Sequence, residues 1–296
     1  MLGSEVMRVL ARDRGIAAIP TTINMMDVTN LAQVRDVLSR HRPTHIIHTA
    51  AFTHVDTAEK DPLRAHTINA EGTKNLAFFC REQDIEMIYL STDYVFSGEG
   101  STPWAEDTPP SPINTYGRTK LLGEQYIATL LDRYKVVRTS WLNGLGGDYT
   151  RNFIETMLRI SQSRTTLSLV SDQTGRPTFT FDLAPALVAL LDVTSYGIYH
   201  VCNRGECSWY DFAKEIFAVS GKYNVEVKPI TSDHFRSAAR RPAYSVLSTA
   251  RYDALGLGQL PDWPSSLRRY FRRREVFQAA ASREEPGPSP HAERMA

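Results

Sequence analysis

The sequence is poor in cysteine and carries almost no net charge. Its 296 residues include three cysteines, Cys80, Cys202 and Cys207, and no metal-ligand spacing links them. An odd and sparse set argues against a disulfide framework and for a reducing compartment, so we expect a cytoplasmic protein. The formal net charge of +1 gives no reason to expect nucleic acid or an anionic membrane as a partner.

Long apolar runs are absent as well. No segment is long enough to span a bilayer, and no signal peptide precedes the first predicted helix, so we expect no membrane association. The composition, 42% hydrophobic and 23% charged, fits a soluble globular protein with ample length for a core.

Helices and strands alternate over the first half of the chain. Apolar periodicity predicts helices over residues 2–14, 31–40, 62–81 and 115–132, and strands over residues 16–20, 44–51, 85–90 and 135–139. The strand at 85–90 is apolar throughout, as expected when helices cover both faces of a sheet. The alternation therefore predicts an α/β fold of the Rossmann-like, doubly wound parallel type.

The pattern divides the chain into three parts. Residues 1–145 are predicted to form a dinucleotide-binding domain. Residues 146–271 have a less regular texture and are interpreted mainly as a smaller C-terminal substrate lobe over the carboxyl ends of the strands, where doubly wound folds bind ligands. Residues 272–296 are charged and rich in Ala, Pro and Glu, and we expect a disordered tail.

The chain begins inside the expected first helix. A dinucleotide-binding fold opens with a strand and a glycine-rich turn, and the helix that follows holds the pyrophosphate. Here the first strand and the earlier glycines are missing, which leaves Gly3 as the last glycine of such a turn and as a cofactor-binding candidate. A start assigned too late and a true truncation with impaired cofactor binding both explain this pattern. An incidental glycine is the third alternative.

Tyr116 and Lys120 form a Tyr-x-x-x-Lys pair at the start of a predicted helix. Residues four apart share a face of a helix, so the phenol and the ammonium group point into the same space. A nearby cation favours the phenolate, which would let Tyr116 pass a proton near neutral pH. A reductase needs such a proton donor when a carbonyl receives a hydride. Because the spacing is common in surface pairs, its meaning depends on its neighbours.

Ser91, Thr92 and Asp93 follow directly on the strand at 85–90. These residues are at the carboxyl end of the strand, beside the expected nicotinamide. There Thr92 can hydrogen-bond the carbonyl of a substrate while Tyr116 protonates it. Ser91 is therefore a cofactor-binding candidate and Asp93 a substrate-binding candidate. The alternative is a Ser/Thr turn that only closes the strand.

These motifs resemble those of the extended short-chain dehydrogenases/reductases. The strings STDYVFSGEG, PPSPINTYGRTKLLGE and VRTSWLNG are similar to one branch, the dTDP-4-dehydrorhamnose reductases. The similarity continues through NFIETML, LSLVSDQTGRPT, GIYHVCN and RRPAYSVLST, and so covers residues 1 to about 270. Sugar-nucleotide epimerases and dehydratases share the fold and the Tyr/Lys pair, but their motif at the fourth strand usually differs from STDYVF.

The resemblance implies that NADPH or NADH reduces the C4 ketone of dTDP-4-dehydro-L-rhamnose to give dTDP-L-rhamnose. In the family, the tyrosine of the pair is the proton donor, which implies Tyr116. The lysine binds the nicotinamide ribose and tunes the tyrosine, which implies Lys120. The hydroxyl residue of the STD motif is the third catalytic member, which implies Thr92.

The resemblance also implies further contacts along the cofactor and the substrate. Asp27 matches an acidic position near the adenine, or is simply a turn or capping residue. Further cofactor-side positions are Ala50, Ala51, Thr53 and Asn69, of which Asn69 supports the active site. Trp141, Arg176 and Arg241 lie where the family meets the sugar nucleotide, and an arginine suits a diphosphate because its planar fork binds two oxygens. Trp141 could also be ordinary core, and one of Arg240 and Arg241 only solvated surface.

Several alternatives remain open at this level. The segment 19–22 (IPTT) lacks an acid for a ribose 2′-hydroxyl, which favours NADPH over NADH. No compensating arginine for a 2′-phosphate is clear, so use of both cofactors is an open alternative. A homodimer is a candidate assembly, and some relatives bind magnesium at a subunit contact. No catalytic metal is predicted, because the histidines at 45, 48, 54 and 66 show no paired ligand spacing. The rival function is a non-catalytic regulatory subunit, like the beta subunit of methionine adenosyltransferase.

Overall fold

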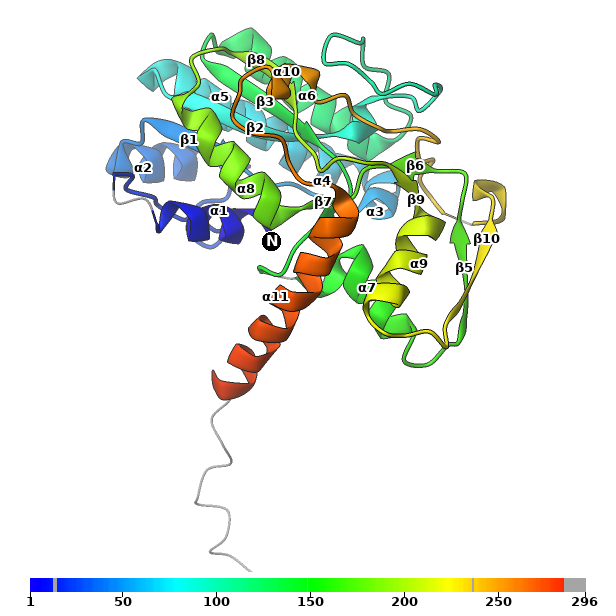
Figure 1. Cartoon of the computed structure of the whole chain (residues 1–296). Helices are drawn as coiled ribbons and strands as arrows, with labels where there is room; N and C mark the ends of the chain where they lie inside the picture. Colours follow the sequence, from blue (N-terminus) through cyan, green and yellow to red (C-terminus); the bar gives the residue numbers. More distant parts are fainter. Residues whose placement is uncertain (13–14, 148, 236, 285–296) are drawn as a thin grey trace, which may run out of the picture.

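A parallel sheet forms the centre of the larger part of the molecule. The computed structural model describes residues 1–12, 15–147, 149–235 and 237–284. Within these residues the main sheet has four strands in the order β1-β2-β3-β8, all parallel (Figure 1). The strands are β1 (His45–His48), β2 (Glu86–Thr92), β3 (Tyr134–Thr139) and β8 (Gly197–His200). The predicted α/β fold with a parallel sheet is thereby confirmed.

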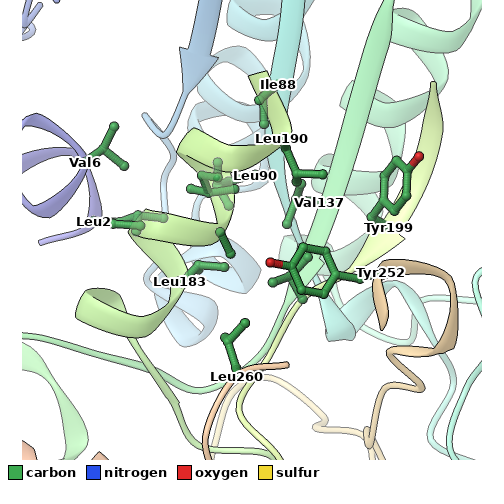
Figure 2. Packing of buried hydrophobic residues seen from close by; sticks show 14 of the residues in the cluster. Leu2, Val6, Ile88, Leu90, Val137, Leu183, Leu190, Tyr199, Tyr252 and Leu260 are labelled. Atoms are coloured by element: carbon green, nitrogen blue, oxygen red, sulfur yellow. The ribbon is translucent and has the colours of Figure 1, made fainter. Parts of the chain in front are cut away.

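Helices cover both faces of this sheet. One face packs against α2 (Leu31–His41), α5 (Gly72–Gln83) and α6 (Thr115–Leu130). The other face packs against α1 (Leu2–Leu10) and α8 (Thr180–Ala189), and Figure 2 shows this second core.

Alternation along β2 divides its side chains between the two cores. Met87 and Tyr89 point into the first, and Ile88 and Leu90 into the second. A central strand that is buried on both faces reads as a continuous apolar run, which is why its position was visible in the sequence.

The helix predicted over residues 62–81 is interrupted by a π turn. It consists of α4 (Pro62–His66), the π segment Thr67–Glu71, and α5. A short helix, α3 (Val55–Lys60), precedes it. π turns widen a helix locally and often occur at functional sites. Here the π segment carries Asn69, whose amide bonds to the loop after β1 and to α6.

Residues 16–20 do not form the predicted strand. The segment from Gly15 to Thr22 is irregular, and Ile16 and Ile19 remain 37% and 42% exposed. A strand requires a neighbour for its backbone hydrogen bonds, and the described residues provide none at this position.

The smaller lobe contains short strands and two helices around its own apolar core. Its helices are α7 (Phe153–Ile160) and α9 (Trp209–Val219), and α9 lies beside the parallel pair of β5 (Thr166–Val170) and β10 (Glu226–Ile230) (Figure 1). The remaining short strands are β4 (Leu142–Asn143), β6 (Thr174–Gly175), β7 (Thr178–Phe179) and β9 (Cys207–Ser208). The short helix α10 (Ala250–Asp253) packs on the main sheet, with Tyr252 in the core of the larger part. Between β7 and β9 the chain returns to the larger part, since α8 packs on α1 and β8 joins the main sheet.

The last described helix, α11 (Trp263–Glu284), corrects the expected disordered tail over residues 272–284. Charge predicted disorder there, but Arg273 and Arg274, with Arg269 one turn earlier in the same helix, pair with largely buried carboxylates of other elements. The pairs are Arg269–Asp182 at 2.9 Å, Arg273–Glu5 at 3.2 Å and Arg274–Glu155 at 2.6 Å. The rest of the expected tail, residues 285–296, lies outside the described residues. No helix in the described part of the chain is long and apolar enough to cross a membrane.

A close contact between α6 and β2 predicts a sensitive position at Gly123 of α6. A Cβ at this position would collide with the Tyr89 hydroxyl and lie 2.9 Å from the Asn69 carbonyl. Because both neighbours are buried, Gly123→Ala should lower the free energy of unfolding by about 1–3 kcal/mol, as overpacking does. Urea unfolding measures the change. Ala128→Ser, on the exposed face of α6, is the control and should stay within about 0.5 kcal/mol of the parent chain. Equal stability of the two variants would refute the close packing.

Candidate active site

The start of α6 is held tightly over the loop that follows β2. Asn114 caps the helix, with its Oδ1 accepting from the Gly117 amide at 2.8 Å and its Nδ2 donating to the Arg240 carbonyl at 2.9 Å. A Cβ at Gly117 would collide with the Tyr94 carbonyl, so α6 approaches the turn Asp93–Val95 closely. This packing brings the first turns of α6 to the carboxyl end of β2.

Tyr116 lies beside Thr92, as the sequence predicts. It is half-buried, and its ring packs edge-on against Tyr94 with the centroids 6.0 Å apart. Burial raises the pKa of Tyr116 to about 12, although a hydrogen bond with Thr92 opposes the shift. The predicted lowering of the Tyr116 pKa by Lys120 is therefore not found, and Lys120 is not among the causes of the shift. A phenol that is protonated at neutral pH can still act as a proton donor.

Lys120 is buried, and its ammonium group faces an aromatic ring. The side chain is 2% exposed, with Nζ 4.0 Å from the centroid of the Tyr89 ring. Burial lowers the pKa of Lys120 to about 7, and the nearby Glu124 carboxylate opposes the shift. Burial, with Lys120 as the second cause, lowers the pKa of His48 to about 3, so that His48 is neutral. Tyr89 and Lys120 thus form the inner wall of the site.

A buried ammonium group suits the hydroxyl groups of a sugar. Lys120 Nζ carries three donors and lies over the Tyr89 ring. A ligand hydroxyl that reaches this ammonium group can accept a hydrogen bond from it. The residues here are compatible with the ribose of a nicotinamide cofactor, the role that the family resemblance implies for Lys120.

Asp93 carries the clearest unsatisfied group at the carboxyl end of β2. It is 2% exposed, and its Oδ2 has no hydrogen-bond partner within the described chain. Oδ1 accepts from the Thr92 hydroxyl at 3.1 Å. Burial raises the pKa of Asp93 to about 7, against the effect of hydrogen bonds with Ser245 and Thr92. A free carboxyl oxygen next to Tyr116 suits a hydroxyl of a polar substrate.

Two predicted cofactor ligands are occupied by other partners. Ser91 donates a short hydrogen bond to Glu124, because successive side chains of β2 point to opposite faces and only Thr92 turns toward Tyr116. The Asn69 amide bonds to Phe52 N at 2.7 Å, Phe52 O at 3.1 Å and Thr119 Oγ1 at 3.0 Å. Asn69 therefore supports the site, and the Ser91 hydroxyl uses its donor on Glu124.

The other predicted cofactor residues lie around the carboxyl end of β1. Gly3, in the first turn of α1, is close to Thr49, since a Cβ there would lie 3.1 Å from Thr49 Oγ1. Ala50 and Thr53 are exposed and Ala51 is half-buried, as expected for residues that line an open groove.

Asp27 does what the alternative interpretation of the sequence proposed. Its Oδ1 accepts hydrogen bonds from the Thr29 amide at 2.9 Å and the Thr29 hydroxyl at 2.8 Å, which orders the turn before α2. It also lines a hollow of about 390 Å³ together with Ile23, Leu63 and Arg64. These two hydrogen bonds use Oδ1 of Asp27, and the hollow beside it is large enough for part of a ligand.

Trp141 is held in an uncommon backbone conformation. Its φ angle of 44° is left-handed, which strains a bulky residue and persists where surrounding packing enforces it. The indole stacks on Trp209 with the centroids 3.5 Å apart, and a Cβ on Gly175 would lie 2.5 Å from it. Trp141 is thus packed into the smaller lobe, which supports the core alternative without removing its half-exposed side from the site.

Arg176 and Arg241 differ in how they are held. Arg176 Nη1 lies 3.9 Å from Cys202 Sγ, while its buried Nε has no partner among the described residues. Arg241 pairs with Asp56 of α3 at 2.6 Å and lies close to Tyr94. Burial lowers the pKa of the Arg241 guanidinium, but the hydrogen bond to Asp56 outweighs this and raises the pKa overall.

Sequence reasoning missed several residues that shape the site. Segment 239–248 crosses its face, because Ala239 N donates to Asp56 at 3.0 Å and Ser245 N donates to the Thr174 carbonyl at 2.9 Å. Tyr94 and Ser245 sit in STDYVF and RRPAYSVLST, so the motifs were visible but the contacts were not. Among the described residues, no group of three or more His, Cys, Asp or Glu side chains is arranged to hold a metal ion.

Comparisons with known proteins agree on one family. A family model described as the RmlD substrate binding domain matches residues 1–276. A dTDP-4-keto-6-deoxy-D-glucose reductase from Streptomyces niveus is 40% identical over 272 residues, which are 92% of this chain and 93% of that protein. A dTDP-4-dehydrorhamnose reductase from Streptomyces griseus is 40% identical over 294 residues, which are 97% of this chain and 94% of that protein.

A solved structure agrees with these relatives. The dTDP-4-dehydrorhamnose reductase of Bacillus anthracis, in complex with NADP, superimposes with a TM-score of 0.87 at 39% identity. The match covers 92% of this chain and 95% of that one.

The buried ammonium group predicts a pH-dependent cost to folding. The pKa of Lys120 is about 7 when folded, against about 10.4 in an unfolded chain, so unfolding takes up a proton between these pH values and stability rises with pH there. Lys120→Met should therefore stabilise the chain most at and below pH 7. Its advantage should shrink by up to about 1.4 kcal/mol per pH unit between pH 7 and 10.

Urea unfolding of the two chains from pH 6 to 10 measures this advantage. Lys60→Met, at an exposed lysine of α3, should show no such trend. A Lys120→Met advantage that is constant with pH would contradict the burial of a titrating ammonium group.

Proposed function

Because the chain belongs to the dTDP-4-dehydrorhamnose reductase family, we propose that it reduces the C4 ketone of a nucleotide-diphospho-4-keto-6-deoxy sugar with NADPH. The observation that carries the proposal is the meeting of Thr92, Tyr116 and Lys120 at the carboxyl end of β2. The substrate proposed is dTDP-4-dehydro-L-rhamnose, and the product is dTDP-L-rhamnose. The NADP complex of the Bacillus anthracis relative supports NADPH as the cofactor.

Each of these side chains has one task in the proposed reaction. When bound, the reduced nicotinamide supplies a hydride to the C4 carbon. The Tyr116 hydroxyl donates a proton to the C4 oxygen, and its pKa of about 12 keeps that proton in place before the reaction. Thr92 orients the same oxygen through its hydroxyl. The Lys120 ammonium group binds ribose hydroxyls of the cofactor.

The groups on the substrate side favour a charged, polar ligand. Asp93 Oδ2 and Arg176 Nε are buried and lack partners in the described chain, and each would gain a hydrogen bond from a sugar or phosphate oxygen. Arg241 carries a guanidinium fork that suits a diphosphate once it exchanges Asp56 for the ligand. A small hydrophobic ketone has no hydroxyl or phosphate oxygens that these side chains could bind.

The direct test is reconstitution of the reaction. dTDP-glucose, a 4,6-dehydratase, a 3,5-epimerase, NADPH and this chain are combined, and dTDP-rhamnose is sought by chromatography and mass spectrometry. Formation of product that depends on the chain supports the proposal. Absence of product, together with tight binding to the catalytic subunit of another enzyme, would favour the regulatory alternative.

Removal of the phenol should abolish most of the turnover. Tyr116→Phe keeps the ring that packs on Tyr94 but removes the proton donor. We expect kcat to fall by about 10² or more, the scale of a positioned general acid. Tyr126→Phe, which removes a hydroxyl from a more remote turn of α6, should keep near-normal kcat. Near-normal turnover of Tyr116→Phe would exclude Tyr116 as the donor.

The diphosphate role of Arg241 can be separated from its pairing with Asp56. Arg241→Ala should lower kcat/KM about tenfold or more, equivalent to about 1.4 kcal/mol, because the nucleotide loses a charge-assisted contact. Asp56→Ala breaks the same ion pair but keeps the guanidinium, so kcat/KM should fall less. If both variants lose kcat/KM equally, the pair is structural and Arg241 does not bind the diphosphate.

Location and assembly belong to the same proposal. A cytoplasmic location is supported by the three cysteines, which are all free and buried. A homodimer is proposed as the assembly, and sedimentation analysis of the purified chain decides between it and a monomer.

A further inference from the structure

A second set of charged side chains lies buried directly behind Lys120. Glu124 follows Lys120 by one turn on the same face of α6 and is 4% exposed. Its carboxylate accepts two hydrogen bonds from Arg138 of β3, from Nε at 3.0 Å and from Nη2 at 2.7 Å. The Ser91 hydroxyl of β2 donates a third. A carboxylate held by a bidentate guanidinium and a hydroxyl has little freedom to move.

The anchor of this carboxylate extends across the sheet. Arg138 is 1% exposed, and its Nη1 lies 3.5 Å from Nε2 of His200 on β8. His200 Nδ1 lies 3.1 Å from both the Trp104 and the Ser248 carbonyls, so this nitrogen carries the proton. Burial lowers the pKa of His200 to about 3, and His200 is therefore neutral. Glu124 is thus tied to the segments that close the substrate side.

A buried ion pair by itself is weak evidence of stabilisation, because desolvation offsets the attraction between the charges. The chain contains a second such pair, Glu86–Lys135, at the opposite end of β2. Glu86 and Lys135 are 4% and 0% exposed, like the pair at the active site. What sets Glu124 apart is its position one turn from a lysine whose ammonium group faces Tyr89.

We propose that Glu124 is a positioning residue: held by Arg138 and Ser91, its carboxylate keeps the Lys120 ammonium group charged and in place over the Tyr89 ring. The importance of this interaction for catalysis rests on the proposed function. The interaction itself is a property of the chain and can be tested without a cofactor.

The other titratable groups around Lys120 cannot supply this negative charge. Tyr116 faces it from α6, Tyr89 from β2 and His48 from β1. Burial raises the pKa of both phenols and lowers that of His48, so all three are neutral near pH 7.

Around Glu124 itself, the facing groups are Arg138 of β3 and the neutral His200 of β8. Among the groups named around Lys120 and Glu124, Glu124 is the anion. Its carboxylate raises the pKa of Lys120, whereas burial lowers it.

The test follows the proton of Lys120 through unfolding. Glu124→Gln keeps the size of the side chain but removes its charge, so the folded chain should release the Lys120 proton at a lower pH. Urea unfolding is measured from pH 5 to 9 for this variant and for Glu124→Gln/Lys120→Met. Between pH 5 and 7, unfolding of the single variant should take up more protons than unfolding of the double variant, by a margin larger than the parent chain shows against Lys120→Met. When the parent chain is compared with Lys120→Met, the extra proton uptake on unfolding should arise only above about pH 7.

Two features isolate the effect. His48 titrates below this window, and burial, the larger cause of its lowered pKa, persists in every variant. Glu86→Gln makes the same change in the remote buried pair and should leave the Lys120-dependent proton uptake above pH 7. If Glu124→Gln and its Lys120→Met double show parallel pH dependence between pH 5 and 7, Glu124 is only a structural partner of Arg138 and the proposal fails.

Glu124→Gln leaves the Arg138 charge buried without a partner and could therefore prevent folding. A second variant tests the proposal in that case. Glu124→Gln/Arg138→Gln replaces both charges and is compared with the same chain carrying Lys120→Met. The early proton uptake is expected again, because Arg138 is not among the causes that shift the pKa of Lys120. Its absence in this background also overturns the proposal.

Catalysis gives an independent readout. The basic limb of the pH profile of kcat/KM should move to lower pH in Glu124→Gln, because each unit lost from the pKa of Lys120 cuts its charged fraction about tenfold at higher pH. The KM for NADPH should rise with it, while Glu86→Gln should match the parent profile. An unshifted basic limb in Glu124→Gln would contradict the proposal. A parent chain without reductase activity would refute the proposed function, and the unfolding comparison would still decide the role of Glu124.

Discussion

The close contact between α6 and β2 is the constraint on which the rest of the structure depends. Gly117 and Gly123 let the helix approach the Tyr94 carbonyl and the Tyr89 hydroxyl without a Cβ in between. This approach buries Lys120 and places Tyr116 beside Thr92. Burial then sets the charge states, with a protonated phenol, a neutral His48 and an ammonium group near its titration point. Packing at one helix–strand contact thus prepares the groups that a ketone reduction requires.

A second layer of contacts holds this arrangement from outside. Asn69 in the π segment ties the loop after β1 to Thr119 of α6. Asn114 ties the start of α6 to the Arg240 carbonyl, and the following segment pairs with the Thr174 strand. Elements from both parts of the chain therefore converge on the carboxyl ends of β1 and β2. Doubly wound folds bind ligands at this edge, which agrees with the position of the site.

Much of the larger part and the centre of the site could be predicted from the sequence. Strand β2 is a buried apolar run, and Tyr116, Lys120 and Thr92 lie in local motifs, so their spacing and neighbours were enough. Long-range pairings were not predictable. The partners of Ser91 and Arg241 come from residues 33 and 185 positions away in the chain, and only the folded structure brings them together. The prediction of a disordered tail was wrong over residues 272–284 for the same reason. The ion pairs of Arg273 with Glu5 and of Arg274 with Glu155 join residues far apart in the sequence.

In the proposed reaction this chain directs a hydride from a nicotinamide to the C4 carbon of a nucleotide-linked 4-keto sugar. The most direct measurement uses NADPH with deuterium at both hydrogen positions of nicotinamide C4, with dTDP-4-dehydro-L-rhamnose generated in place and this chain as the reductase. Proton and deuterium NMR of the isolated dTDP-rhamnose locate the label. The account predicts one deuterium at C4 of the sugar in product whose formation depends on the chain. Unlabelled product, or deuterium at another carbon, would contradict it.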